Sequence, residues 1–309
     1  MDRPSLRLAT SAVVVAVALA SAACSSGPSV LTTSTTAKPK PAAPVPLLYV
    51  SLGDSYAAGY QPSGPHSGRT DTNGFAYQIP GLAARKGDQL ALVNFGCGGA
   101  TTTSILHSVG CGQLGPGATP YPTESQAAAA EAFLLHHRGK IGLITVSIGG
   151  NDVTRCVGAA SVVACVTAAV VKIKRNLAVL LDGLRSAAGP SVPIVGTTYP
   201  DVILGLDLSG QASQRSLAKL SVVAFKDLIN PALEHAYSAV HADFVDVTAA
   251  TGAYGSLSRL TDLQPYGRIP VPVARVCELT YFCQYHDIHP RTAGYKIIAE
   301  LVVATLPAH

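Results

Sequence analysis

Five short runs of apolar and β-branched residues recur along the chain, and they lie after a stretch over 25–45 that is rich in Ser, Thr, Pro, Ala and Lys. Most of these runs are continuous rather than alternating, which is typical of strands buried on both faces of a parallel sheet. The long segments between them favour crossover connections that place helices on both faces. The sequence therefore predicts a three-layer α/β/α fold around a central, mostly parallel five-stranded sheet. The expected strands are 46–52, 90–95, 141–148, 192–198 and 242–247.

Helical patterns occupy the segments between these runs. Thr123 with Gln126 three residues later resembles a capping box, so a helix is expected over 124–137. The longest pattern, 211–240, contains Pro231, near which the helix is expected to break. The other expected helices are 75–86, 162–187 and 291–306. No internal repeat or second domain is indicated.

The first 23 residues resemble a signal peptide, with Arg3 and Arg7 before an apolar stretch over 9–20 that is too short to span a membrane. Ser21-Ala22-Ala23-Cys24 resembles the lipobox of bacterial lipoproteins, although Ser21 stands where Leu is usual. Cleavage by ordinary signal peptidase after Ala23 is the alternative. We expect an exported protein, anchored to the outer side of the cell membrane by acylated Cys24 or secreted. Residues 24–45 would then form a flexible tether and 46–309 the folded domain.

Charge excludes one class of partner. The 22 basic and 18 acidic residues give a net charge of +4 without a dense basic run, so nucleic acid is not an expected partner. Charged residues make up only 13% of the chain. Two explanations of this low charged fraction are possible: small apolar residues cover much of an ordinary surface, or part of the surface is apolar because it contacts lipid. We expect a monomer.

Six cysteines remain when Cys24 is set aside, and an even number in an exported chain predicts disulfides. Fifteen pairings are possible, of which pairing in sequence order is the simplest. A zinc site is the alternative interpretation of these cysteines, but neither a CxxC pair nor an HExxH motif supports it, so no metal is expected. The expected pairs are Cys97–Cys111, Cys156–Cys165 and Cys277–Cys283.

Candidate chemistry follows three of the predicted strands. Gly53-Asp54-Ser55 ends the first strand, and its serine would be exposed at the carboxyl edge of the sheet, at the start of a helix. The alternative is a simple turn with a helix cap. Glycines around Gly99 and the side-chain amide of Asn151 follow the second and third strands, where turn chemistry is again the alternative. Ligands bind at this edge in open α/β sheets, so these residues are expected to lie together.

A fourth candidate lies near the C-terminus, in the segment YHDIHPRTAGY. His289 precedes Pro290, which restricts the histidine to an extended conformation and fits the first turn of the following helix. The imidazole would therefore be presented from a loop at a helix start. An ordinary surface histidine is the alternative.

Taken together, these blocks resemble the SGNH or GDSL hydrolase family, and in particular its exported actinobacterial esterase and lipase branch. The similarity runs from Val50 to Tyr295. It implies flavodoxin-like layering, Ser55 as nucleophile and His289 as general base. It also implies an oxyanion hole made by the backbone N–H groups of Ser55 and Gly99 and the amide of Asn151, with no cofactor.

One position departs from the family pattern, in which an Asp stands three residues before the histidine. His286 occupies that position, and Asp287 is only two residues before His289. In an extended loop, residues two apart point the same way, so Asp287 would need a local turn to reach the far ring nitrogen. We therefore expect the main-chain carbonyl of His286 to orient His289, with Asp287 as the alternative.

The resemblance implies hydrolysis of carboxylic esters through an acyl-enzyme, with lipid esters or acylated glycans as substrates. A cell-envelope acyltransferase with the same residues is one alternative, and a non-catalytic lipoprotein that binds an envelope glycan is another. Tyr281 and Phe282, which precede His289, either form the wall of an acyl pocket or simply pack the Cys277–Cys283 loop.

Overall fold

The central sheet has five parallel strands, and they coincide with the predicted runs to within two residues at each end. The computed structural model describes residues 45–307. The strand order is β4-β1-β5-β6-β7, so the first strand lies between the second and the third. The strands are β1 (Leu47–Gly53), β4 (Leu90–Asn94), β5 (Ile141–Ser147), β6 (Ile194–Thr197) and β7 (Asp243–Val245).

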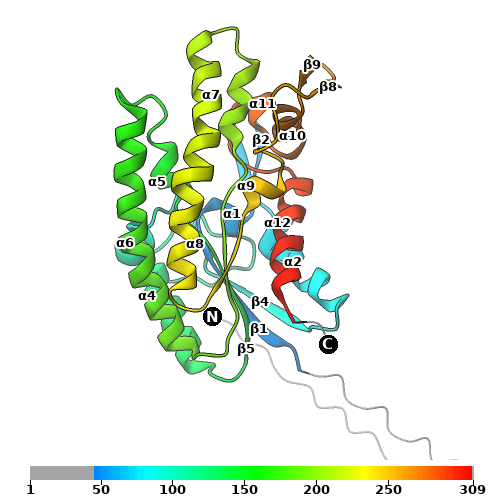
Figure 1. Cartoon of the computed structure of the whole chain (residues 1–309). Helices are drawn as coiled ribbons and strands as arrows, with labels where there is room; N and C mark the ends of the chain where they lie inside the picture. Colours follow the sequence, from blue (N-terminus) through cyan, green and yellow to red (C-terminus); the bar gives the residue numbers. More distant parts are fainter. Residues whose placement is uncertain (1–44, 308–309) are drawn as a thin grey trace, which may run out of the picture. The chain divides into compact units, whose positions relative to one another are not determined.

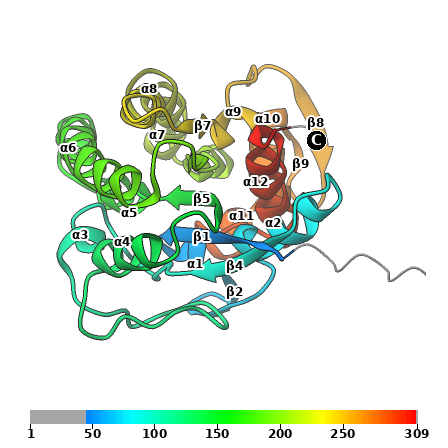
Figure 2. The same ribbon diagram turned by 90° about the horizontal axis from the view of Figure 1, so that it is seen from below.

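Helices cover both faces of this sheet, which confirms the predicted three-layer fold (Figure 2). Alternate residues of β1 enter opposite layers: Val50 and Leu52 pack toward one set of helices and Tyr49 toward the other. Two apolar cores therefore fix the sheet from both sides. One layer contains α4 (Gln126–His136), α6 (Val162–Ala188) and α8 (Asn230–Ser238), and the other contains α2 (Phe75–Ala84) and α12 (Thr292–Thr305).

Two helices differ from expectation. The cap of α4 is Ser125, whose Oγ accepts from the N–H of Ala128 at 3.2 Å, so the capping box predicted for Thr123 and Gln126 is wrong. The long 211–240 pattern consists of α7 (Ala212–Ala224), a π-helical turn η2 (Phe225–Ile229) and α8. Pro231 has no N–H to continue the α-helical ladder, which explains the wider turn just before it.

Short elements gather beyond the carboxyl ends of the strands, at the upper end of the sheet in Figure 1. They include a hairpin, β2 (Tyr60–Gly64) with β3 (Ser67–Thr70), and a second hairpin, β8 (Leu260–Leu263) with β9 (Gly267–Pro270). The helical ones are α1 (Ser55–Ala58), α3 (Ser104–His107), α5 (Gly150–Thr154), η1 (Val202–Leu208), α9 (Val247–Ala250), α10 (Val271–Leu279) and α11 (Phe282–Tyr285).

Three disulfides join the cysteines in sequence order, with Cα–Cα separations of 5.8, 5.5 and 5.1 Å. Each closes a loop at the carboxyl edge of the sheet. Within residues 45–307, no helix combines the length and apolar character needed to span a membrane. The proposed signal peptide, Cys24 and nearly all of the tether lie outside the described residues.

Candidate active site

The first strand ends in a turn that only glycine can make. Gly53 has φ +140°, and a Cβ atom there would lie 2.1 Å from the carbonyl oxygen of Ser147 on β5. Asp54 then caps α1, because its Oδ1 accepts from the N–H of Tyr56 at 2.9 Å. Ser55 is consequently the first residue of α1, at the carboxyl edge of the sheet.

The side chain of a buried glutamine stabilises this turn by hydrogen bonds to its backbone. Gln126 Oε1 accepts from the N–H of Gly53 at 2.7 Å, and its Nε2 donates to the carbonyl of Gly53 at 3.0 Å. Gln126 is only 2% exposed, so both bonds are shielded from water. The sequence pattern predicts a role in a helix cap for Gln126 and gives no sign of this contact, because the partner residue is 73 positions away.

The loops that follow β4 and β5 are joined to each other beside this turn. Asn151 Nδ2 donates to the carbonyl of Ala100 at 2.9 Å. The neighbouring carboxylate of Asp152 accepts from both the N–H and the hydroxyl of Thr102, at 2.8 and 2.9 Å. Because β4 and β5 flank β1, the two loops border Ser55. The second N–H of the Asn151 amide remains available as a donor.

Two backbone donors accompany that amide. Gly99 has φ +77° in a turn closed by the Cys97–Cys111 disulfide, and it is exposed. Within the part of the chain that the structure describes, the N–H groups of Ser55 and Gly99 donate to no protein acceptor. The residues expected to form an oxyanion hole therefore come from three adjacent strand ends, with N–H groups left to donate.

His289 contacts Ser55 across 234 residues of sequence. Its Nε2 lies 2.8 Å from Ser55 Oγ, and its Nδ1 lies 2.6 Å from Asp287 Oδ1. The expectation that the main-chain carbonyl of His286 would receive the ring N–H is wrong. The carboxylate of Asp287 takes that place.

A local turn explains this correction. Asp287 Oδ1 also accepts from the backbone N–H of His289 at 2.9 Å, which is the hydrogen bond of an Asx turn. The turn folds the carboxylate back onto the ring two residues later. His286, with φ +54°, ends α11 in the left-handed region, so this segment is not the extended loop expected from the sequence.

The histidine loop is anchored on both sides. Tyr56 donates its hydroxyl hydrogen to the carbonyl of Ile288 at 2.6 Å, and the ring of Tyr60 lies 4.4 Å from the imidazole, centroid to centroid. Burial alone would raise the pKa of Asp287. The hydrogen bonds from the ring and N–H of His289, together with its charge, outweigh burial and hold that pKa below its usual range. Asp287 therefore stays ionised beside the imidazole.

A second carboxyl group lies beneath the serine. Asp54 is buried, and its Oδ2 accepts from the hydroxyl of Tyr199 at 2.6 Å. Burial raises the pKa of Asp54 to about 6, although the bonds from Tyr199 and Tyr56 oppose the shift. Tyr199 lies two residues after the end of β6, as Ser55 lies two residues after the end of β1, so its place after a predicted strand was the signal that could have identified it.

The two aromatic residues considered for an acyl pocket do not line a cavity at Ser55. Phe282 packs against the backbone of Gly205 in η1 and is 7% exposed. Tyr281 stacks on Tyr285 and lies under the guanidinium of Arg291 at 4.5 Å. Both residues pack the loop closed by Cys277–Cys283. Among residues 45–307, no group of three or more His, Cys, Asp or Glu side chains is placed to hold a metal ion.

Comparison with known proteins finds one family and several solved structures to which this chain is similar. A sequence model of the GDSL-like lipase/acylhydrolase family matches residues 51–297. A lipase from a goat rumen metagenome is 17% identical, with a TM-score of 0.52 over 84% of this chain and 96% of that one. The extracellular lipase of Streptomyces rimosus is 20% identical, with a TM-score of 0.48 over 84% of this chain and 100% of that one. No curated protein matches significantly.

The buried carboxyl of Asp54 predicts a pH dependence of stability. Because folding raises its pKa from 3.8 to about 6, its contribution is complete below pH 3.8 and is lost as pH rises through about 6. Asp54→Asn removes this titration. Between acidic and neutral pH, the free energy of unfolding of the wild type should fall by about 3 kcal/mol relative to the variant. Urea unfolding at a series of pH values measures the difference, and parallel pH profiles would contradict it.

Proposed function

This chain belongs to the GDSL-like lipase/acylhydrolase family and is a carboxylic ester hydrolase, and we propose that it cleaves esters through an acyl-enzyme on Ser55. The observation that carries the proposal is the hydrogen-bonded series Asp287–His289–Ser55, with separations of 2.6 and 2.8 Å. A serine hydroxyl is a weak nucleophile until an adjacent base removes its proton, and this series supplies the base and its orienting group.

Each group in the series has a distinct role in the proposed reaction. His289 Nε2 takes the proton of Ser55 Oγ as that oxygen attacks the ester carbonyl carbon. The same nitrogen then returns a proton to the departing alcohol, which leaves an acyl-enzyme. In the second half of the reaction, His289 Nε2 takes a proton from water as the water oxygen attacks the acyl carbonyl carbon. The bond to Ser55 Oγ then breaks, Ser55 regains its proton from His289, and the acid is released. Asp287 accepts from Nδ1, which sets the tautomer of His289 and stabilises the imidazolium while it exists.

The carbonyl oxygen becomes an anion in the tetrahedral intermediate and needs donors already in place. We assign this role to the N–H groups of Ser55 and Gly99 and to the amide of Asn151. The bond from Asn151 to Ala100 and the bonds from Thr102 to Asp152 support the assignment, because they fix the donors before substrate binds. Fixed donors stabilise the developing charge without reorganisation.

Two rival functions remain alternatives. An acyltransferase would use the same acyl-enzyme and pass the acyl group to an alcohol of another envelope molecule. A non-catalytic glycan-binding lipoprotein would not need a serine bonded to a histidine and a carboxylate, so the geometry favours an enzyme. Lipid esters and acylated glycans are both candidate substrates for the general reaction.

We propose that the enzyme acts outside the cytoplasm, tethered through acylated Cys24. The lipobox-like sequence and the three disulfides of the folded domain support this location. Mass spectrometry of the mature protein should find an N-terminal diacylated cysteine at position 24. A Cys24→Ala variant should move from the membrane fraction to the medium, and an unmodified wild-type N-terminus would contradict the proposal.

Reaction of Ser55 with a fluorophosphonate probe tests the nucleophile. The wild-type protein should be labelled at Ser55, whereas Ser55→Ala should not be labelled and should lose ester hydrolysis. An added alcohol acceptor separates the alternatives, because a transferase yields the new ester in place of the free acid. Labelling of another residue, or unchanged turnover by Ser55→Ala, would contradict the proposed role.

Substitution of Asp287 tests which group orients His289. Asp287→Ala removes both the Nδ1 contact and the Asx turn, so kcat should fall by orders of magnitude, toward the ~10⁴-fold loss seen when a triad acid is neutralised. His286→Asn is the matched control, because Asn tolerates the left-handed conformation and keeps the main-chain carbonyl. Its kcat should stay close to that of the wild type. A small loss with Asp287→Ala would favour an orienting carbonyl after all.

A further inference from the structure

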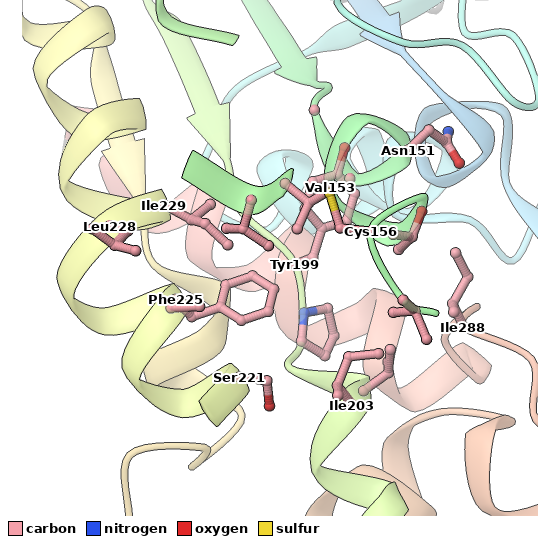
Figure 3. A pocket seen from close by; sticks show the side chains of 18 of the residues that line it. Asn151, Val153, Cys156, Tyr199, Ile203, Ser221, Phe225, Leu228, Ile229 and Ile288 are labelled. Atoms are coloured by element: carbon pink, nitrogen blue, oxygen red, sulfur yellow. The ribbon is translucent and has the colours of Figure 1, made fainter. Parts of the chain in front are cut away.

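Ser55 is one of the residues that line an apolar cavity. The cavity lies between helices on one side of the sheet, and Figure 3 shows side chains of its walls. Its volume is about 230 Å³. An apolar cavity of ~150 Å³ stays dry and binds benzene, so this one is large enough for a substantial hydrocarbon group. Its walls come from α5, α6, η1, α7, η2 and the start of α8.

The chemistry of the walls excludes a sugar as occupant. Beyond the residues at Ser55 and Asn151, almost all lining side chains are aliphatic or aromatic. Ser221 is one exception, and its hydroxyl hydrogen is already donated to Asp201 Oδ2 at 2.8 Å. Thr154 is another, and the carboxylate of Asp54, which also lines the cavity, already accepts from Tyr199 and from the N–H of Tyr56. No Lys, Arg or Glu lines the cavity. A glycan would lose its hydrogen bonds to water there without replacement, whereas a hydrocarbon chain would gain by leaving water.

The position of the cavity relative to the catalytic groups indicates which part of an ester it binds, the acyl chain or the alcohol. Ser55 and Asn151 line it, but His289 does not. The leaving alcohol must lie against His289 Nε2 to receive its proton. The group that extends from the carbonyl carbon into the cavity is therefore the acyl chain.

The far part of the cavity reaches the surface through apolar side chains. Val163 on α6 is 55% exposed, and Val223 and Leu228 on the opposite wall are 50% and 42% exposed, and all three line the cavity. Exposed aliphatic residues gathered at the rim of an apolar cavity are typical of a site that receives apolar ligands. Along α6, lining residues extend from Val162 to Ile173, which corresponds to about 16 Å of helix.

From these observations we propose that the cavity binds the acyl chain of a fatty-acid ester, so the enzyme is a lipid acyl hydrolase rather than a deacetylase of glycans. This inference rests on the proposed acyl-enzyme chemistry at Ser55. In it, α6 and the α7–η2–α8 segment bind the chain, and the oxyanion donors hold its carbonyl group.

Hydrolysis of p-nitrophenyl acetate, butyrate, octanoate, laurate and palmitate by the full-length protein tests the substrate class. While the growing chain remains inside the cavity, each added methylene should raise kcat/KM by up to about fourfold. The increase should stop where the chain outgrows the cavity. The highest kcat/KM for acetate, or faster turnover of an acetylated oligosaccharide than of octanoate, would overturn the proposal.

Narrowing the cavity should shorten the preferred chain. Val166 is 6% exposed and lines the cavity from α6, so Val166→Phe should lower kcat/KM for laurate at least tenfold and change that for acetate less than twofold. Val163→Phe makes the same change at the exposed rim, where folding tolerates it, and should act in the same direction. Val179→Phe is the matched control, since Val179 is 58% exposed on α6 and does not line the cavity. Equal losses on acetate and laurate would overturn the proposal.

A binding measurement separates this inference from the catalytic proposal. Ser55→Ala should bind a fluorescent fatty acid, and addition of Val166→Phe should weaken that binding at least tenfold. If the fatty acid binds but the wild type shows no turnover that depends on Ser55, the acyl-enzyme proposal is contradicted and the proposal of an acyl-binding cavity still holds. Ser55-dependent turnover with no dependence on chain length and no fatty-acid binding would contradict the cavity proposal alone.

Discussion

The close approach of β1 and β5 at Gly53 controls the position of the nucleophile. No side chain fits there, because a Cβ atom would lie 2.1 Å from the carbonyl oxygen of Ser147. The strand therefore turns sharply at its carboxyl end, and Gln126 holds both backbone groups of the turn. Ser55 follows after one further residue, so the packing of two backbones fixes its place. Every other element of the site is arranged around that point.

Long-range hydrogen bonds then bring the remaining groups to Ser55. Tyr56, the residue after the serine, donates to the carbonyl of Ile288, so the start of α1 is tied to the loop that carries His289. Bonds between the loops after β4 and β5 hold Asn151 in the same way. These partly buried, satisfied hydrogen bonds stiffen the site, and stiffness allows fixed donors to stabilise charge as it develops.

The helical layer on one face of the sheet has two functions in this interpretation. Toward the sheet, α6 and α8 bury the aliphatic core that stabilises the fold. At their ends nearer the serine, the same helices and the π-helical turn leave an apolar cavity in place of close packing. Protein interiors are normally packed without such gaps, and an unfilled apolar volume costs stability. An acyl chain that fills the volume would restore those contacts.

The sequence by itself determined the layered fold and the five strands, because burial patterns and strand ends are local signals. It also predicted the sequence-order disulfides, as the simplest of fifteen pairings, and the meeting of Ser55 with His289, from their expected place at one sheet edge and the family resemblance. The tertiary structure decided two further points. Asp287, rather than the carbonyl of His286, contacts the imidazole, since a left-handed residue and an Asx turn reshape that loop. The cavity likewise became visible only in three dimensions, because its walls come from helices far apart in sequence, and apolar spacing alone does not reveal whether facing helices touch or leave room for a ligand.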